Sequence, residues 1–304
     1  MKHLFIVNPT AGSKDKTEYV RKCAEEALKG CTDEYEVYVT KAPLDATHKI
    51  QEDAKLYDKL HVYACGGDGT FNECVCGGAM LDNVAVAPFP TGTGNDFCRM
   101  FGDESELYRD LKALTQGSVH PIDLIDCNGR YSVNICCVGI DARVGADVHK
   151  YSGIPVIGGA GGYVISVLVH ILKGISRRMK ITCGDYYKDA ETALVCACNG
   201  RFYGGGFNPS LNARPDDGIL DIYIIKKIGL ITLARLIGKY ASGKADELPE
   251  YVTHLRADNI SIEFENDEVV NFDGEVMYTK KADMKLVPKA LNLIVPKGMK
   301  FFES

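Results

Sequence analysis

The chain has 304 residues, of which 46% are hydrophobic and 25% are charged, and it contains no tryptophan. This length favours two domains, each large enough to bury its own core. A formal net charge of −6 argues against a nucleic-acid-binding protein, because such a protein needs a concentrated basic surface to neutralise phosphates.

The twelve cysteines are scattered along the sequence. The N-terminal apolar run is too short for a signal peptide, so we expect a reducing cytoplasmic compartment rather than disulfide bonds. Two close pairs, Cys74 with Cys76 and Cys196 with Cys198, lack a second pair at the spacing of zinc ligands. We interpret the cysteines as small buried hydrophobic residues.

The first third of the chain alternates short apolar runs with helical patterns. A helical repeat of apolar residues runs from Val20 to Leu28, and Gly30 follows where a C-terminal cap is expected. Four runs are typical of strands in a parallel sheet: Leu4 to Val7, Tyr35 to Val39, His61 to Cys65 and Val84 to Ala87. This alternation predicts a doubly wound α/β domain.

The pattern changes after about Pro121. Two stretches, Gly162 to Gly174 and Gly229 to Gly243, look helical, and the apolar part of the first, Tyr163 to Leu172, is too short to span a bilayer. The other segments resemble strands: Arg130 to Val138, Ala193 to Cys198, Leu220 to Ile225 and Asn259 to Phe264. We predict an antiparallel β domain with a few helices.

Three glycine-rich loops follow predicted strands of the first domain: Asn8 to Gly12, Gly66 to Thr70 and Pro90 to Phe97. Ligands of α/β domains bind at the carboxyl ends of the strands, so we expect these loops to converge on one edge of the sheet. Glycine lets phosphate oxygens approach backbone N–H groups, often at positive φ. The loops therefore predict an anion site.

Asp68 lies between the glycines of the second loop, where a carboxylate beside a phosphate is unfavourable unless a cation lies between them. Magnesium carried by a nucleotide would supply that cation. We expect a helix to begin near Phe71, with Thr70 and Glu73 forming a capping box. The alternative for this motif is an ordinary glycine and aspartate turn.

These motifs also resemble a known family. "GGDGT" followed by "NE" is similar to the signature shared by NAD kinases, phosphofructokinases and diacylglycerol kinase catalytic domains, and "PTGTGNDFCR" resembles the lipid kinases specifically. The resemblance continues through "VNICCVGIDARV", "NGRFYGGGFNPSLNARPDDGILDI" and "NFDGE", with Leu211 departing from an expected alanine. Over nearly its whole length, the chain resembles the bacterial diacylglycerol kinase family of soluble lipid kinases, relatives of sphingosine and ceramide kinases.

The resemblance implies a fold of the α/β plus β class. Residues 1–121 would form a doubly wound three-layer α/β domain, like that of NAD kinases and phosphofructokinases. Residues 290–304 would return to this domain through a strand at Leu291 to Val295. Residues 122–289 would form a C-terminal antiparallel β-sandwich that binds lipid.

The resemblance further implies that ATP and Mg²⁺ bind to the first domain. Asp68 would hold the catalytic magnesium directly or through water, and Asp123 would belong to a magnesium and water network. Glu275 would accept the proton of the lipid hydroxyl, a role that phosphoryl transfer to an alcohol requires of a nearby carboxylate. The residues that would bind the nucleotide are Asn8, Pro9, Gly12, Thr40, Gly66, Gly67, Asp68, Gly69, Thr70, Asn72, Thr93, Asn95 and Asp96.

A separate structural magnesium site is implied by "RPDDGILD", with the side chain of Asp217 and the carbonyl groups of Arg214 and Ile219 as ligands. The residues alone permit other interpretations. Asp217 could belong to a β-turn, Glu275 to an exposed hairpin tip, and Asp123 to the surface at a strand start.

A basic segment could place the protein at a membrane. Its residues could attract anionic headgroups, by about 1 kcal/mol per basic residue near the surface, or could form a solvated helix end. We expect a cytoplasmic protein that contacts the membrane transiently to take up its lipid. The sequence does not decide whether two chains form a homodimer through an exposed strand edge. The basic residues are Lys173, Arg177, Arg178 and Lys180.

The sequence thus predicts an ATP- and magnesium-dependent kinase for the hydroxyl of diacylglycerol or a related lipid alcohol. One alternative is a NAD kinase-like nucleotide kinase, against which the "GTGNDF" loop argues. Another is a non-catalytic lipid or nucleotide sensor, against which the presence of both Asp68 and Glu275 argues. Diacylglycerol, phosphatidylglycerol, ceramide and undecaprenol-like alcohols are not distinguished.

Overall fold

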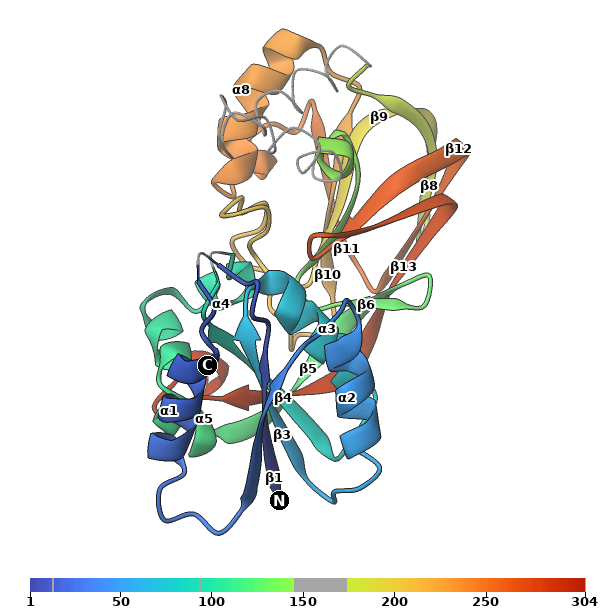
Figure 1. Cartoon of the computed structure of the whole chain (residues 1–304). Coiled ribbons are helices and arrows are strands. Elements are labelled where there is room, and N and C mark those ends of the chain that lie inside the picture. Colours follow the sequence, from blue (N-terminus) through green and yellow to red (C-terminus); the bar gives the residue numbers. More distant parts are fainter. Residues whose placement is uncertain (13, 93, 145–173, 304) are drawn as a thin grey trace. The chain divides into compact units, whose positions relative to one another are not determined.

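The computed structural model describes residues 1–12, 14–92, 94–144 and 174–303 (Figure 1). The chain divides into two compact units, Met1–Leu124 with Val287–Ser304, and Ile125–Leu286. The boundaries expected from the sequence differ by three residues at each of the two points where the chain passes between the units. Two strands, β5 (Ser118–Cys127) and β13 (Glu275–Val295), each contribute residues to both units.

The first unit is built on a parallel sheet with the strand order β13, β4, β3, β1, β2. All residues of β1 and β4 are buried, as the apolar runs of the sequence predict for parallel strands covered on both faces. The predicted return strand is confirmed by the parallel pairing of Asn292 and Leu293 with β4. The other strands are β1 (Lys2–Val7), β2 (Glu34–Val39), β3 (Leu60–Gly66) and β4 (Val84–Pro90).

Helices cover both faces of this sheet, which gives the three layers expected of a doubly wound domain. Figure 1 shows α1 (Thr17–Ala27) and α5 (Leu111–Thr115) on one face, and α2 (Asp45–Asp53) and α3 (Asp68–Gly78) on the other. Gly30, with φ of 84°, follows the end of α1 as predicted. The short helices are α4 (Asp96–Arg99), η1 (Gly102–Arg109) and η3 (Phe301–Glu303).

The second unit is antiparallel, with the strand order β11, β10, β9, β7, β12, β13, and with β8 paired to β9 and β12. The side chains of β7 alternate between two hydrophobic clusters: Cys136 and Val138 lie in one, and Ile135 and Cys137 in the other. The strands are β6 (Arg130–Ser132), β7 (Ile135–Gly139), β8 (Arg177–Cys183), β9 (Tyr186–Cys198), β10 (Leu220–Lys226), β11 (Val252–Ala257) and β12 (Asn259–Phe272).

The helical segments that the structure describes in this unit are a turn over residues 140–144, α8 (Leu230–Ala241) and the short η2 (Ala245–Glu247). The helix predicted between Gly229 and Gly243 is therefore confirmed, whereas the one predicted from Gly162 falls almost wholly outside the described residues. The strand expected from Arg130 to Val138 is interrupted between β6 and β7.

All twelve cysteines are free, and the interpretation as small buried hydrophobic residues is confirmed for nine of them. Cys23 and Cys76 are half-buried, and Cys31 is exposed. The buried pair Cys196 and Cys198 brings its two sulfur atoms to 3.5 Å, without a disulfide bond. In the part of the chain that the structure describes, no helix is long and apolar enough to cross a membrane.

Candidate functional site

The three glycine-rich loops lie at the carboxyl edge of the first unit's parallel sheet and are tied to one another. The N–H groups of Thr91 and Gly92, after β4, both donate to the carbonyl oxygen of Gly66, at 3.0 and 2.9 Å. The N–H of Asn8, after β1, donates to Cys65 at the end of β3. The expected convergence of the loops is therefore present in the fold.

The glycines of these loops are needed mainly because the loops pack against one another. A Cβ atom on Gly92 would lie 2.9 Å from the nitrogen of Gly67, and one on Gly67 would lie 3.0 Å from the carbonyl oxygen of Gly94. A Cβ atom on Gly66 would lie 2.3 Å from the hydroxyl of Thr70. The expectation of positive φ is wrong for these residues; in the described loops it holds for Gly12, at 83°.

Asp68 lies at the centre of this arrangement. Its Oδ1 atom accepts the backbone N–H of Asp96 at 2.8 Å, and its own N–H donates to the carbonyl oxygen of Gly94 at 3.0 Å. A Cβ atom on Gly94 would lie 2.8 Å from the Oδ2 atom of Asp68. The second and third loops thus hold this carboxylate in one position.

The helix after this loop, α3, begins at Asp68 with Gly67 as its N-cap, and not near Phe71 as predicted. The N–H of Phe71 already donates to the carbonyl oxygen of Gly67 at 3.0 Å, and the capping residue makes no side-chain bond. The predicted capping box is therefore wrong, because Thr70 lies within the helix and is not its N-cap residue. A carboxylate in the first turn is favoured by the helix dipole, and the positive end of that dipole also attracts an anion.

The third loop is held by its own polar residues. The side-chain amide of Asn95 donates to the carbonyl oxygen of Gly92 at 3.1 Å. Asp96, the first residue of α4, is buried and pairs with Arg99 at 3.0 Å. Thr93, which was expected to contact phosphate, lies outside the described residues.

The other predicted nucleotide residues occupy different positions around the same edge. The side chain of Asn8 accepts the N–H and hydroxyl of Thr10 at 3.0 and 2.8 Å and so shapes its own loop, in which Pro9 and Gly12 also lie. Thr40 directly follows β2 and donates its N–H to Val7 at 2.9 Å. Gly69 is exposed in the first turn of α3, whereas Asn72 is buried within that helix.

Asp123 lies in β5 and is only 3% exposed, so the interpretation as a surface residue is wrong. Its Oδ1 atom accepts the backbone N–H of Lys289, on the returning part of β13, at 2.8 Å. The carboxylate is therefore fixed within the first unit.

Glu275 is the first residue of β13 in the second unit and is exposed. It pairs with Phe272 across a hairpin whose two turn residues, Asp273 and Gly274, have φ of 51° and 95°. Positive φ at both residues is typical of the type I′ turn, in which aspartate followed by glycine is preferred. The local structure is thus the hairpin tip that the residues alone suggested, with a carboxylate available to solvent.

Asp273, which the sequence did not single out, anchors this hairpin. Its carboxylate accepts the backbone N–H groups of Val133, Asn134 and Ile135 at 2.6, 3.1 and 2.9 Å. Burial raises the pKa of the Asp273 carboxyl, while these hydrogen bonds act in the opposite direction. The "DG" dipeptide predicted the turn, but no local signal identified N–H donors 140 positions away in sequence.

Asp217 lies in a turn with Gly218, whose φ is 74°. The carboxylate of Asp217 accepts the N–H of Ile219 at 3.2 Å and a guanidinium N–H of Arg256 at 3.2 Å. The turn interpretation fits this geometry, and a magnesium ion here would have to displace Arg256, which is exposed. Arg214 pairs through its side chain with Asp216 at 3.0 Å.

Within the described residues, the group of three potential metal-ligating side chains with ligand atoms within 4.8 Å of one another is His3, Cys31 and Asp33. A cation at Asp68 would therefore need oxygen ligands from a bound phosphate or from water.

The basic residues between Arg177 and Lys180 lie on β8, so the alternative of a solvated helix end is wrong for them. Lys173 lies outside the described residues. Arg178 is paired with Asp189 through two hydrogen bonds of 2.8 and 3.1 Å. Arg177 lies 3.3 Å from a carboxylate oxygen of Glu268. Acidic neighbours thus offset much of the positive charge of this segment.

Comparison with known proteins matches both units to families. Residues 2–127 match the "Diacylglycerol kinase catalytic domain", and residues 134–295 match the "YegS C-terminal NAD kinase beta sandwich-like domain". A Shewanella frigidimarina protein named "Probable lipid kinase YegS-like" is 27% identical over 237 residues, which are 76% of this chain and 75% of that protein. The crystal structure of a diacylglycerol kinase from Bacillus anthracis is similar with a TM-score of 0.72 and 28% identity, covering 98% of each chain.

Proposed function

The chain belongs to the family of lipid kinase-like proteins that joins a diacylglycerol kinase catalytic domain to a YegS-type C-terminal sandwich, and on this premise we propose its reaction. The protein transfers the γ-phosphoryl group of ATP, with Mg²⁺, to the hydroxyl group of diacylglycerol or a related lipid alcohol. The comparisons support a kinase of this family, and the acceptor and the nucleotide are part of the proposal.

The observation that carries the proposal is the position of Asp68 within the interlocked loops. Its carboxylate is fixed by the N–H of Asp96 and lies at the start of α3, where the positive end of the helix dipole favours an anion. A phosphate there would meet both attractive N–H groups and a repulsive carboxylate. Mg²⁺ bound with the nucleotide would bridge the two and neutralise the charge that develops on the transferred group.

Glu275 is the proposed proton acceptor for the lipid hydroxyl. Its exposure makes the carboxylate accessible to a substrate, and the turn that carries it is held by three hydrogen bonds to Asp273. A general base must be positioned before it can help, so this anchoring supports the role. Asp123 is proposed to orient water and magnesium from its fixed position beside Lys289.

Three further points belong to the proposal. The turn at Asp217 would bind a structural magnesium ion, provided that Arg256 moves aside. The protein would be cytoplasmic and would contact the membrane surface transiently, by residues other than the paired Arg177 and Arg178. A homodimer would use an edge strand of the second unit, such as β11.

The test is transfer of labelled γ-phosphate from ATP to a panel of lipids in mixed micelles with magnesium, beside NAD and buffer blanks. We expect label in one class of lipid. Asp68→Asn, which keeps the hydrogen bond from Asp96, should lower the rate about 100-fold because charge stabilisation is lost. Glu275→Gln should lower it by about 10² to 10⁴, the usual contribution of a general base.

Glu265→Gln is the matched control, because Glu265 is an exposed glutamate of the same unit. It should leave the rate unchanged. Label in NAD alone would replace the proposal with a nucleotide kinase. ATP binding without transfer to any acceptor would favour a sensor.

A further inference from the structure

A second candidate binding site lies in the second unit, where the chain leaves β7. Gly139 has φ of 110°, and a Cβ atom there would lie 2.3 Å from the carbonyl oxygen of Ala193. Only glycine fits at position 139 without a steric clash. The chain then continues directly into a helical turn over residues 140–144. Asp141 is presented by this turn.

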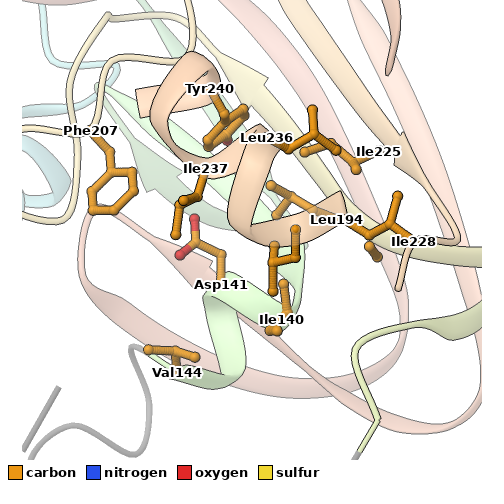
Figure 2. Close-up of a pocket in the computed structure, with 12 residues that line it drawn as sticks. Ile140, Asp141, Val144, Leu194, Phe207, Ile225, Ile228, Leu236, Ile237 and Tyr240 are labelled. Carbon is orange, nitrogen blue, oxygen red and sulfur yellow. The ribbon is translucent and has the colours of Figure 1, made fainter. Parts of the chain in front are cut away.

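Asp141 faces a hydrophobic pocket between this turn and α8. The pocket forms a hollow of about 580 Å³, including its open mouth. Its lining is apolar apart from Asp141 and Tyr240, and includes Leu194, Phe207 and Ile237. Figure 2 shows the carboxyl group of Asp141 pointing into the space beside Ile237.

The carboxyl group of Asp141 is not compensated by the described residues around it. Its Oδ2 atom is buried and has no hydrogen-bond partner among them. Arg143, two positions further on, directs its guanidinium to the carbonyl groups of Gly139 and Ile175, at 3.2 and 2.8 Å, and of Gly174.

The protonation of Asp141 follows from this environment. Burial raises the pKa of the Asp141 carboxyl to about 7, because an ion without a partner is unfavourable in an apolar site. The titratable groups that face it are Cys137 of β7 and Tyr240 of α8. Burial raises the pKa of both groups, so both are neutral near pH 7 and neither supplies a compensating charge.

We propose that this pocket takes one hydrocarbon chain of an acyl lipid, and that the carboxyl group of Asp141 donates a hydrogen bond to the carbonyl oxygen at the head of that chain. The choice of a lipid rests on the proposed function. A neutral carboxyl carries one O–H donor, and no described residue forms a hydrogen bond with the Oδ2 atom of Asp141. An ester or amide carbonyl satisfies that donor, whereas a hydrocarbon chain without a carbonyl leaves it unpaired.

Two consequences follow for the substrate. Lipids with ester or amide carbonyl groups, such as diacylglycerol or ceramide, should be preferred over polyprenol-like alcohols. Binding should also weaken as pH rises, because only the protonated acid donates. With a pKa of about 7, affinity for the acyl lipid should fall about tenfold between pH 6 and pH 8.

The test is calorimetric titration, without ATP, of 1,2-dihexanoylglycerol and of its ether analogue 1,2-dihexylglycerol, which has the same chains and lacks the carbonyl groups. At pH 6 we expect the ester to bind about tenfold more tightly, the usual effect of one buried hydrogen bond. This preference should shrink at pH 8. Equal binding of ester and ether at pH 6 would overturn the proposal.

Variants identify the residue and the pocket. Asp141→Asn keeps a donor and should retain the ester preference without its pH dependence, and Asp141→Leu should abolish the preference. Ile237→Glu should abolish binding of both ligands, whereas Ile231→Glu, at an exposed position of the same helix outside the pocket lining, should not. Retained preference in Asp141→Leu, or unchanged binding in Ile237→Glu, would refute the assignment.

The binding test is separate from the test of the proposed function. Ester preference with no phosphate transfer to any lipid would leave the pocket standing and remove the kinase. Phosphate transfer with equal binding of ester and ether would support the kinase and refute the proposed role of the pocket.

Discussion

Replacing Asp273 by alanine tests the anchoring of the Glu275 hairpin. The three N–H groups that donate to Asp273 belong to Val133, Asn134 and Ile135, which are each at most 4% exposed. Removing the carboxylate leaves three buried donors without this acceptor, at a cost of about 1–3 kcal/mol each that is not fully additive. Alanine is also less suited than aspartate to the φ of 51°.

The expected loss in the free energy of unfolding is about 3–6 kcal/mol for Asp273→Ala, and about 1–3 kcal/mol for Asp273→Asn, which keeps one acceptor oxygen. Urea unfolding followed by circular dichroism measures this loss. Hydrogen exchange measures it locally, because the amide protons of residues 133–135 should exchange faster in the variant.

Asp267→Ala is the control, since Asp267 is an exposed aspartate on the same strand, β12. Its effect should stay within about 0.5 kcal/mol. If Asp273→Ala unfolds at the same urea concentration as this control, and the amides of residues 133–135 keep their protection, the hydrogen bonds are not what holds the hairpin.

Two further predictions concern backbone packing and pH. Gly92→Ala should destabilise the first unit by about 1–3 kcal/mol, because its Cβ atom would lie 2.9 Å from the nitrogen of Gly67. Gly238→Ala should stabilise the protein by up to about 1 kcal/mol, because a Cβ atom at this position of α8 has open space. Equal midpoints of urea unfolding for the two variants would contradict these predictions. The raised pKa of Asp141 means that the folded protein holds this proton more firmly than the unfolded chain, so the contribution of Asp141 to wild-type stability should fall between about pH 4 and pH 7. Asp141→Asn does not titrate and should therefore gain stability relative to wild type by roughly 1–3 kcal/mol at pH 8; a constant difference from pH 5 to pH 8 would refute this.

The sequence predicted those parts of the fold that depend on local pattern. The apolar runs in β1 and β4, the glycine-rich loops after them and the turn at Asp273 and Gly274 are properties of neighbouring residues. The carboxyl ends of parallel strands meet at one edge, so convergence of the loops followed from the strand assignment alone.

Features that depend on distant residues were not predictable in the same way. The start of α3 at Asp68 depends on the third loop, because Gly94 accepts the N–H of Asp68 and Asp96 donates to its side chain. The sequence indicates a ligand as the reason for the loop glycines, but it does not reveal that a Cβ atom on Gly67 or Gly92 would meet the backbone of a neighbouring loop. The pocket at Asp141 combines segments from β7 to α8 that no single stretch of sequence reveals.

The pairing of β13 with β4 has a consequence for the order in which the protein is made. Asn292 pairs with Ala85, so the ribosome adds the partner of β4 roughly 200 residues after β4 itself. At bacterial or eukaryotic synthesis rates this delay is about 10–40 s, during which the buried strand β4 has an unpaired edge. The first unit is thus begun first and completed last, and the edge of β4 is open to pairing with another chain until β13 emerges.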